Sequence, residues 1–165
     1  MAIDALLKFE GKISIPGESV VDGHEGELDI TSFSWGVTNA ATRHMATGGG
    51  KGKGDISDLH LMHSTDKSGP MLMICCASGD HIDKATLTVR KAGGTDEGPL
   101  DYIKLEMTDV FVSSYQTGGS SGGDTGDSFS LNFATINFIY TPQSKEGGGE
   151  GDVTQGWDVA KGKKL

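Results

Sequence analysis

The sequence predicts a mainly β protein, a barrel or a sandwich, with one short α-helix at about residues 68–78. Most patterned segments alternate apolar and polar residues with period two, which is typical of half-buried strands. Glycine accounts for 26 of the 165 residues and separates these segments, as expected for turns between strands. One segment breaks the alternation with a continuous apolar run. A chain of this length fits one domain, residues 1–165, with a substantial core.

The first clear alternation lies in residues 28–37 and separates bulky from small side chains. Because successive side chains of a strand point to opposite faces, each set shares one side of the sheet. We expect the bulky set to face the core: Thr31, Phe33, Trp35 and Val37. We expect the small, mostly polar set on the opposite face: Ile30, Ser32, Ser34 and Gly36.

Further strands follow the same period along the chain. In 56–62, Leu59 and Leu61 lie opposite Asp58 and His60, and in 85–90 three apolar residues alternate with polar ones. We interpret 102–107 and 110–115 as two strands joined through Thr108-Asp109.

The longest alternating segment, Ser128–Thr141, ends before Pro142, which cannot continue a ladder. The glycine-rich stretches are expected as loops: an extended arm at 41–54 and flexible loops at 117–127 and 143–153. After the last of these, Gln155–Val159 returns as a strand.

The helix is predicted by the segment "SGPMLMICCASG". Ser68 is a capping residue, and Pro70 falls in the first turn, where its missing N–H costs nothing. Apolar residues then continue to Ala77, and Gly79 permits a left-handed exit. The unbroken apolar run indicates a short, deeply buried helix.

The charge balance argues against several partners. A formal net charge of −9 disfavours nucleic acid and anionic membrane surfaces, because an acidic field repels phosphates. No apolar run approaches the roughly 20 residues of a membrane span, and the first residues lack a signal-peptide pattern. We expect a protein made in the cytoplasm, with Cys75 and Cys76 reduced, since a bridge between neighbours is strained.

The stretch "MATGGGKGKGDIS", residues 45–57, suggests a phosphate-binding loop but fails the spacing of one. A Walker A loop needs G-x-x-x-x-G-K-[ST] followed by a helix. Gly52-Lys53 has Thr47 and Gly54 at the other two required positions, and the sequence continues into a strand. We interpret the stretch as an extended arm.

No catalytic constellation emerges from the remaining motifs, and we expect neither a cofactor nor a metal. Ser121 in "GSSGG" matches a nucleophile elbow, but another strand follows where a helix is required. His60 and His63 have metal-like spacing, yet positions three apart on a strand point to opposite faces. The chain is therefore not expected to be an enzyme.

Several segments together resemble the haemolysin-coregulated protein (Hcp) family, the tube-forming subunit of the bacterial type VI secretion system. The resemblance covers about residues 2–159, in order and without large gaps. It is carried by "IPGES", "HEGELDI", "ITSFSWGVTN", "HMATGGGKGKGDISDLHLMHSTDKSGPMLM", "ATLTVRKAGG", "YIKLEMTDVFVSSYQTGGS", "SFSLNFATINFIYTPQ" and "GWDV". The glycine-rich 145–152 segment is the one departure that we notice.

The resemblance implies a compact β-barrel of two sheets with one flanking α-helix. It also implies a homohexameric ring with a wide channel. Rings would stack into a secreted tube that has sheath, spike and baseplate proteins as partners and carries small effector proteins in its lumen. Export would then occur without a signal peptide. Two alternatives stay open: a small β-barrel serine hydrolase using Ser121, and a monomeric ligand-binding module. The effectors, the target cell, the stacking polarity and the role as main subunit or paralogue are not set by the sequence.

Within that picture two groups of residues are candidates. The small polar face suggests Ser32 and Ser34 as lumen or effector-binding residues. The glycine-rich arm suggests contacts with a neighbouring subunit, because glycines permit close backbone approach. Its candidate residues are Arg43, His44, Met45, Gly48, Gly49, Gly50, Lys51, Gly52 and Lys53.

Overall fold

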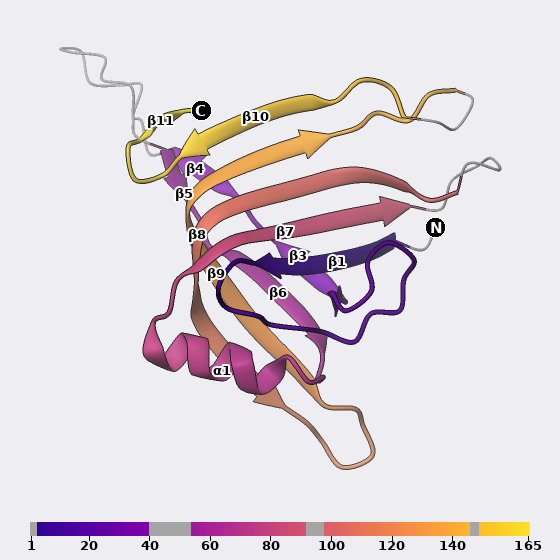
Figure 1. The fold of residues 1–165 in the computed structure, drawn as a ribbon, viewed down its shortest axis with the longest axis vertical. Coiled ribbons are helices and arrows are strands. Elements are labelled where there is room, and N and C mark those ends of the chain that lie inside the picture. Colours follow the sequence, from indigo (N-terminus) through magenta and orange to yellow (C-terminus); the bar gives the residue numbers. More distant parts are fainter. Residues whose placement is uncertain (1–2, 40–53, 92–97, 146–148) are drawn as a thin grey trace.

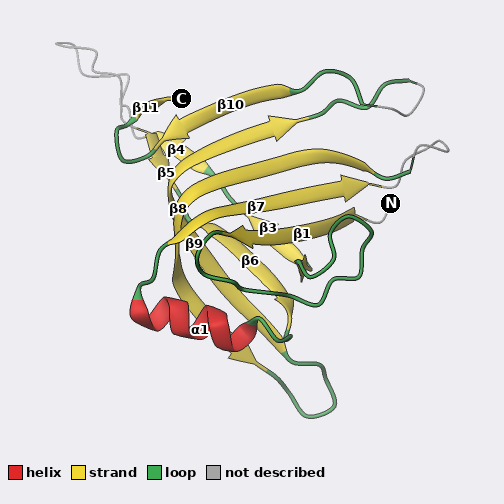
Figure 2. Cartoon of the chain, in the orientation of Figure 1, coloured by secondary structure: helices red, strands yellow, loops and turns green. Residues whose placement is uncertain are grey.

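The computed structural model describes residues 3–39, 54–91, 98–145 and 149–165. Within them the chain forms strands and a helix, drawn along the sequence in Figure 1 and by type in Figure 2. In chain order these are β1 (Ile3–Glu10), β2 (Leu28–Ile30), β3 (Ser32–Ser34), β4 (Val37–Asn39), β5 (Gly54–Ile56), β6 (Leu59–Ser64), α1 (Gly69–Ser78), β7 (Ile82–Lys91), β8 (Leu100–Gly118), β9 (Gly126–Tyr140), β10 (Val153–Asp158) and β11 (Lys163–Lys164).

The strand pairs of the larger sheet follow a path that almost returns to its start. β2 pairs with β1, then β7, β8, β9, β6 and β3 follow in antiparallel order. Thr31 alone separates β2 from β3, and its N–H and hydroxyl both donate to the Met62 carbonyl, at 2.8 and 3.0 Å. β10 and β11 extend this sheet beside β9, and β4 and β5 form a second, two-stranded sheet. The expected mainly β, two-sheet fold with one helix is confirmed.

The two strands expected at 102–107 and 110–115 are in fact one. β8 runs without interruption over Leu100–Gly118, paired with β7 and β9 on its two sides. Asp109 is the one described non-glycine residue with positive φ, at 50°, and its carboxylate lies 2.6 Å from Nδ1 of His81. Aspartate tolerates this left-handed conformation. The Thr108-Asp109 pair therefore bends a strand and does not end it, so the predicted turn is wrong.

The core lies inside the curved sheet and confirms most of the alternation. Leu59 and Leu61 are buried while His60 is exposed, and the buried residues of β7 include Ala85, Leu87 and Val89. The largest fully buried side chains form one cluster: Phe129, Leu6, Leu7, Leu28, Leu59, Leu61, Leu72, Ile82, Leu87, Leu105, Met107 and Leu131.

The first alternation is only partly correct, because the chain bends at Thr31. Ile30 on β2 is buried, whereas Ser32 on β3 is exposed, so these two residues do not share one face. Phe33 pairs with buried Leu61 and points toward the core side, yet it is 37 % exposed. Within the described residues β3 pairs with β6 alone, so Phe33 lies on an edge where nothing covers its outer side.

The helix has the predicted position but not the predicted burial. α1 covers Gly69–Ser78 and ends at Gly79, whose φ of 70° is the expected left-handed exit. It packs against β8 through Leu72 and Cys75, whereas Met73 and Ile74 are 49 % and 48 % exposed. The prediction of a deeply buried helix is therefore wrong. Both cysteines are free thiols, and burial, then the charge of Asp80, raises the pKa of Cys75.

A buried polar cluster joins β6, β8 and β9 beneath the start of the helix. Nε2 of His63 lies 3.3 Å from Oδ2 of Asp127, and both side chains have no exposed surface. Oδ1 of Asp127 accepts a hydrogen bond of 3.0 Å from the Thr65 hydroxyl, and the Tyr115 hydroxyl also bonds to this carboxylate. Gly69 closes the site, because a Cβ there would lie 2.9 Å from the Tyr115 oxygen.

Tyr115 in this cluster should make the stability of the fold depend on pH in alkaline solution. Burial, followed by the hydrogen bond to Asp127, raises the pKa of Tyr115 above its ordinary value of 10.0. Above about pH 10 the unfolded chain releases this proton while the folded chain retains it, so stability falls as pH rises. Tyr115→Phe should flatten this decline in thermal unfolding midpoints. Tyr140→Phe, at a position 40 % exposed, is the control. An equal slope in both variants would contradict the assignment.

Candidate cargo and assembly surface

Four strands present a polar face on the side of the sheet away from the core. The register of β3, β6, β9 and β8 aligns two cross-strand rows on it, and directly paired residues point to the same side. The first row is Ser34, His60, Ser130 and Ser114. The second is Ser32, Met62, Ser128 and Gln116. Both serines of β3 and both partners on β6 are exposed to solvent.

Hydrogen bonds between side chains hold this face in place where β8 bulges. The hydroxyl oxygen of Ser130 lies 2.7 Å from that of Ser113 and 2.5 Å from that of Ser114. Asp58 accepts hydrogen bonds from Ser113 and from the Asn132 amide, at 2.7 and 2.8 Å. Ser113, Ser114 and Ser130 are thus held together in one hydrogen-bond network.

The two rows carry no lysine, arginine, aspartate or glutamate, although the whole chain has a net charge of −9. His60 is their only titratable side chain. The sequence placed Ser32 and Ser34 on one face but did not connect them with His60 and Met62, because the pairing of β3 with β6 joins residues almost thirty positions apart. The one available signal was the alternation of His60 and Met62 with buried leucines.

The structure does not place the second group of candidates. Arg43, His44, Met45 and the glycine–lysine stretch up to Lys53 lie outside the described residues. The residues that flank them are described: Asn39 pairs with Gly54, so β4 and β5 bring the two ends of the segment side by side. Gly54 itself belongs to β5.

The loop expected at 117–127 is shorter than the sequence suggested, whereas the loop expected at 143–153 nearly matches the connection between β9 and β10. Gly118 ends β8 and Gly126 starts β9, so 119–125 connects the two strands. Gln143 bridges to Gly149 before β10 begins at Val153.

The motifs that suggested chemistry stay apart in the structure. Ser121 lies in the exposed turn between β8 and β9, with a strand on both sides and no helix after it. His60 is exposed and His63 buried, so the expected opposite orientation is confirmed. Among the described residues no group of three histidine, cysteine, aspartate or glutamate side chains could hold a metal ion. No described helix is long and apolar enough to cross a membrane.

The fold and this face define a β-barrel-like protein that presents a hydrogen-bonded wall of small polar side chains. Comparison with known proteins gives the class. Residues 6–140 match the family model described as "Type VI secretion system effector, Hcp". "Protein hcp1" of Pseudomonas aeruginosa is 40 % identical over 161 residues, which are 96 % of each chain.

Solved structures agree. A structure described as a type six secretion system protein has a TM-score of 0.90 at 26 % identity, covering 99 % of this chain and 100 % of the other. Hcp1 from Salmonella typhimurium has a TM-score of 0.79 at 32 % identity, with both chains fully covered. The chain therefore belongs to the Hcp family of type VI secretion proteins.

Proposed function

We propose that the protein is a structural subunit of the type VI secretion tube. Six copies associate into a ring, and the rings stack into a tube that is secreted with its contents. Sheath, spike and baseplate proteins are the partners of the tube, and small effector proteins are its cargo. The role is structural and not catalytic. Family membership supports the secretion role, and a head-to-tail contact between unlike surfaces can close into a ring.

The observation that carries the proposal is the polar face of β3, β6, β9 and β8. One side of these strands is core, and the other presents serines in register with no charged side chain in the two rows. Ser32, Ser34 and Ser114 are exposed, whereas Ser128 is half-buried and Ser130 is buried. Such a face suits the wall of a channel that holds varied proteins by hydrogen bonds. Ser32 and Ser34 would contact the cargo, and the arm that contains Arg43–Lys53 would reach a neighbouring subunit.

Particle mass tests the assembly. The protomer is 17.3 kDa, and we expect light scattering and native mass spectrometry to give six protomers, with open rings in negative-stain images. Deleting Gly48–Lys53 should weaken the ring or tube while the monomer stays folded. A monomer at every concentration tested would refute the proposal.

Enlarging a serine of the polar face tests cargo binding. Ser34→Gln should reduce co-purification of an effector roughly tenfold, because a longer side chain on the exposed row displaces a contact of about 1.4 kcal/mol. The rings should persist in negative-stain images. Ser120→Gln, in the exposed loop between β8 and β9, is the matched control. Equal cargo recovery from both variants would remove Ser34 from the binding surface.

A further inference from the structure

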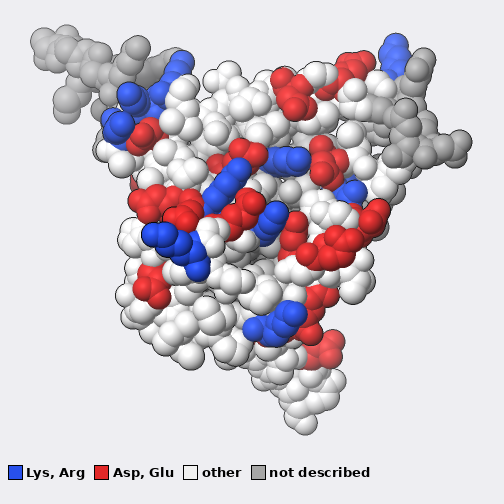
Figure 3. All heavy atoms as spheres, viewed as in Figure 1, with Lys and Arg blue, Asp and Glu red and all other residues white. Residues whose placement is uncertain are grey.

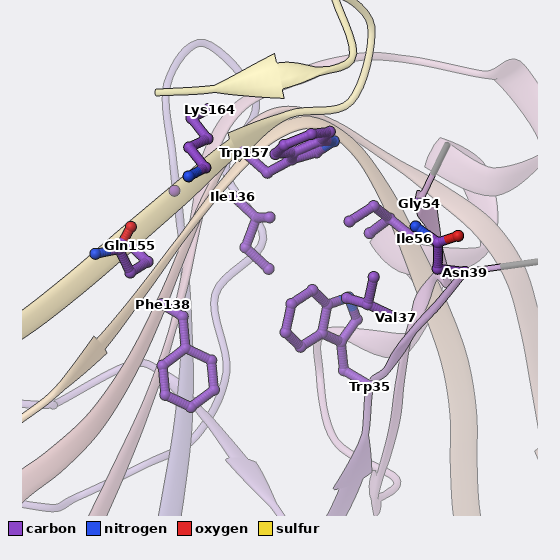
Figure 4. A pocket seen from close by; sticks show the side chains of 11 residues that line it. Trp35, Val37, Asn39, Gly54, Ile56, Ile136, Phe138, Gln155, Trp157 and Lys164 are labelled. Carbon is purple, nitrogen blue, oxygen red and sulfur yellow. The ribbon is translucent and has the colours of Figure 1, made fainter. Parts of the chain in front are cut away.

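The molecule carries a concave apolar surface outside the polar face. A groove of about 410 Å³ lies between the small sheet and β9–β10. Trp35, Val37 and Ile56 form one side, and Phe138 and Trp157 face them across it (Figure 4). The ring centroids of Trp35 and Phe138 are 6.4 Å apart. Val37 is 52 % exposed to solvent.

It also carries a convex apolar surface on α1. Every residue of Gly69–Ser78 is uncharged, and only Gly69, Leu72 and Cys75 are buried. The exposed apolar residues follow helical spacing and form one stripe along the outer side: Pro70, Met73, Ile74 and Ala77. A helix that is apolar all round is normally buried on all sides. The stripe therefore indicates a surface that another molecule covers.

The groove and the C-terminal end of α1 carry opposite charges. Lys164 lines the groove and pairs with Trp157 across β11 and β10. At the opposite surface, the C-terminal end of α1 carries the negative end of the helix dipole, and exposed Asp80 follows it. Figure 3 shows basic side chains gathered near β11, whereas the rest of the visible face mixes both signs.

We propose that the groove of one copy receives the α1 stripe of the next copy. A groove and a ridge on different parts of one chain make a contact between unlike surfaces, which closes into a ring when its rotation divides a full turn evenly. α1 lies at one end of the long strands, away from β10 and β11 (Figure 1). Residues of β10 and β11 line the groove, so the two surfaces lie at separate places on the molecule. The inference rests on the proposed function and adds the surfaces through which copies bind one another.

The test blocks each surface separately. Val37→Glu places a carboxylate in the groove, and Ile74→Glu places one on the stripe at a residue 48 % exposed. We expect each variant alone to lose the ring and give single protomers in native mass spectrometry. Ile3→Glu, at an apolar residue 58 % exposed and remote from both surfaces in sequence, should keep the ring. Circular dichroism confirms that each variant is folded.

Mixing the two variants gives the decisive result. One partner keeps an intact stripe and the other an intact groove, so the mixture should give a one-to-one dimer of twice the protomer mass and nothing larger. If Val37→Glu fails to fold, Lys164→Glu on the exposed strand β11 serves as a second variant that places a carboxylate in the groove. Rings in both single variants, or a mixture that stays monomeric, would overturn this pairing while leaving the ring itself intact. A monomeric wild type would overturn the proposed function and this inference together.

Discussion

Replacing Asp127 with alanine should lower the free energy of unfolding by about 3–5 kcal/mol, because it leaves several buried polar groups without a partner, each at a cost of about 1–3 kcal/mol. The Asp127 carboxylate is the nearest negative group to His63, and both side chains have no exposed surface. Neither ring nitrogen of His63 has a hydrogen bond within the described part of the chain. The substitution takes away the closest polar contact of this ring, and the next carboxylate, that of Asp66, lies 3.8 Å from its Nδ1.

The same substitution deprives two further groups of their partner. Thr65 donates to Oδ1 of Asp127 at 3.0 Å, and the Tyr115 hydroxyl bonds to the same carboxylate. Since these groups come from the β6–α1 connection and from β8, the carboxylate ties the helix start to the sheet. The expected loss is a large fraction of the about 5–15 kcal/mol that a domain of ordinary stability has.

Denaturant unfolding of three variants measures this. Asp127→Asn keeps the size and one acceptor oxygen, so we expect a smaller loss of about 1–3 kcal/mol. Asp124→Ala, in the exposed part of the neighbouring loop, should change stability by less than about 0.5 kcal/mol. A loss below about 1 kcal/mol in Asp127→Ala would show that the pair contributes little.

The sequence was informative where a local pattern coincides with burial. Alternation located β6, β7 and β9, and the serine, proline and glycine of residues 68–79 located α1. It was misleading where tertiary position decides exposure. Phe33 and Ile74 look like core residues, yet one lies at a sheet edge and the other on the outer side of a helix. Assembly could cover both, which a pattern in one chain does not reveal.

Long-range pairing explains what the sequence missed in the site. The sequence assigned Ser32 and Ser34 to one face because both belong to one short alternating segment, and their contact with cargo stays a prediction. His60 and Met62 join them only through the β3–β6 register, and Ser128 and Ser130 only through β9. The sequence did not predict the buried polar cluster for the same reason, because His63 and Asp127 are sixty-four residues apart in the chain. The alternation along one strand assigns a residue to a face of the sheet, but it does not identify the residue beside it on the neighbouring strand.

Replacing Gly17 with alanine should destabilise the protein strongly, by about 1–3 kcal/mol or more, because the added methyl group has no room. An alanine Cβ would lie 2.3 Å from the Glu27 carbonyl oxygen and 2.8 Å from the Cα of Leu28. These are backbone atoms, so no side-chain rotation relieves the overlap. Leu28 is fully buried and starts β2, and a shift there disturbs the core directly.

The surrounding hydrogen bonds make this segment resist the shift. Gly17 and Ser19 donate their N–H groups to the carbonyls of Gly26 and Glu27, at 2.8 and 3.0 Å. His24 lies 2.8 Å from Glu27, and both side chains are almost fully buried. An alanine at position 17 must break this ladder or displace β2.

Thermal and denaturant unfolding of Gly17→Ala test the close approach, and Gly118→Ala is the matched control. A Cβ at Gly118 would meet nothing within 4 Å, so that variant should keep wild-type stability within about 0.5 kcal/mol. Hydrogen exchange should show faster exchange of the Ser19 and Gly26 amides in Gly17→Ala, since their partners move apart. If Gly17→Ala instead unfolds like Gly118→Ala, the segment before β2 must be loosely packed, and its ladder would not help to position the first edge of the barrel.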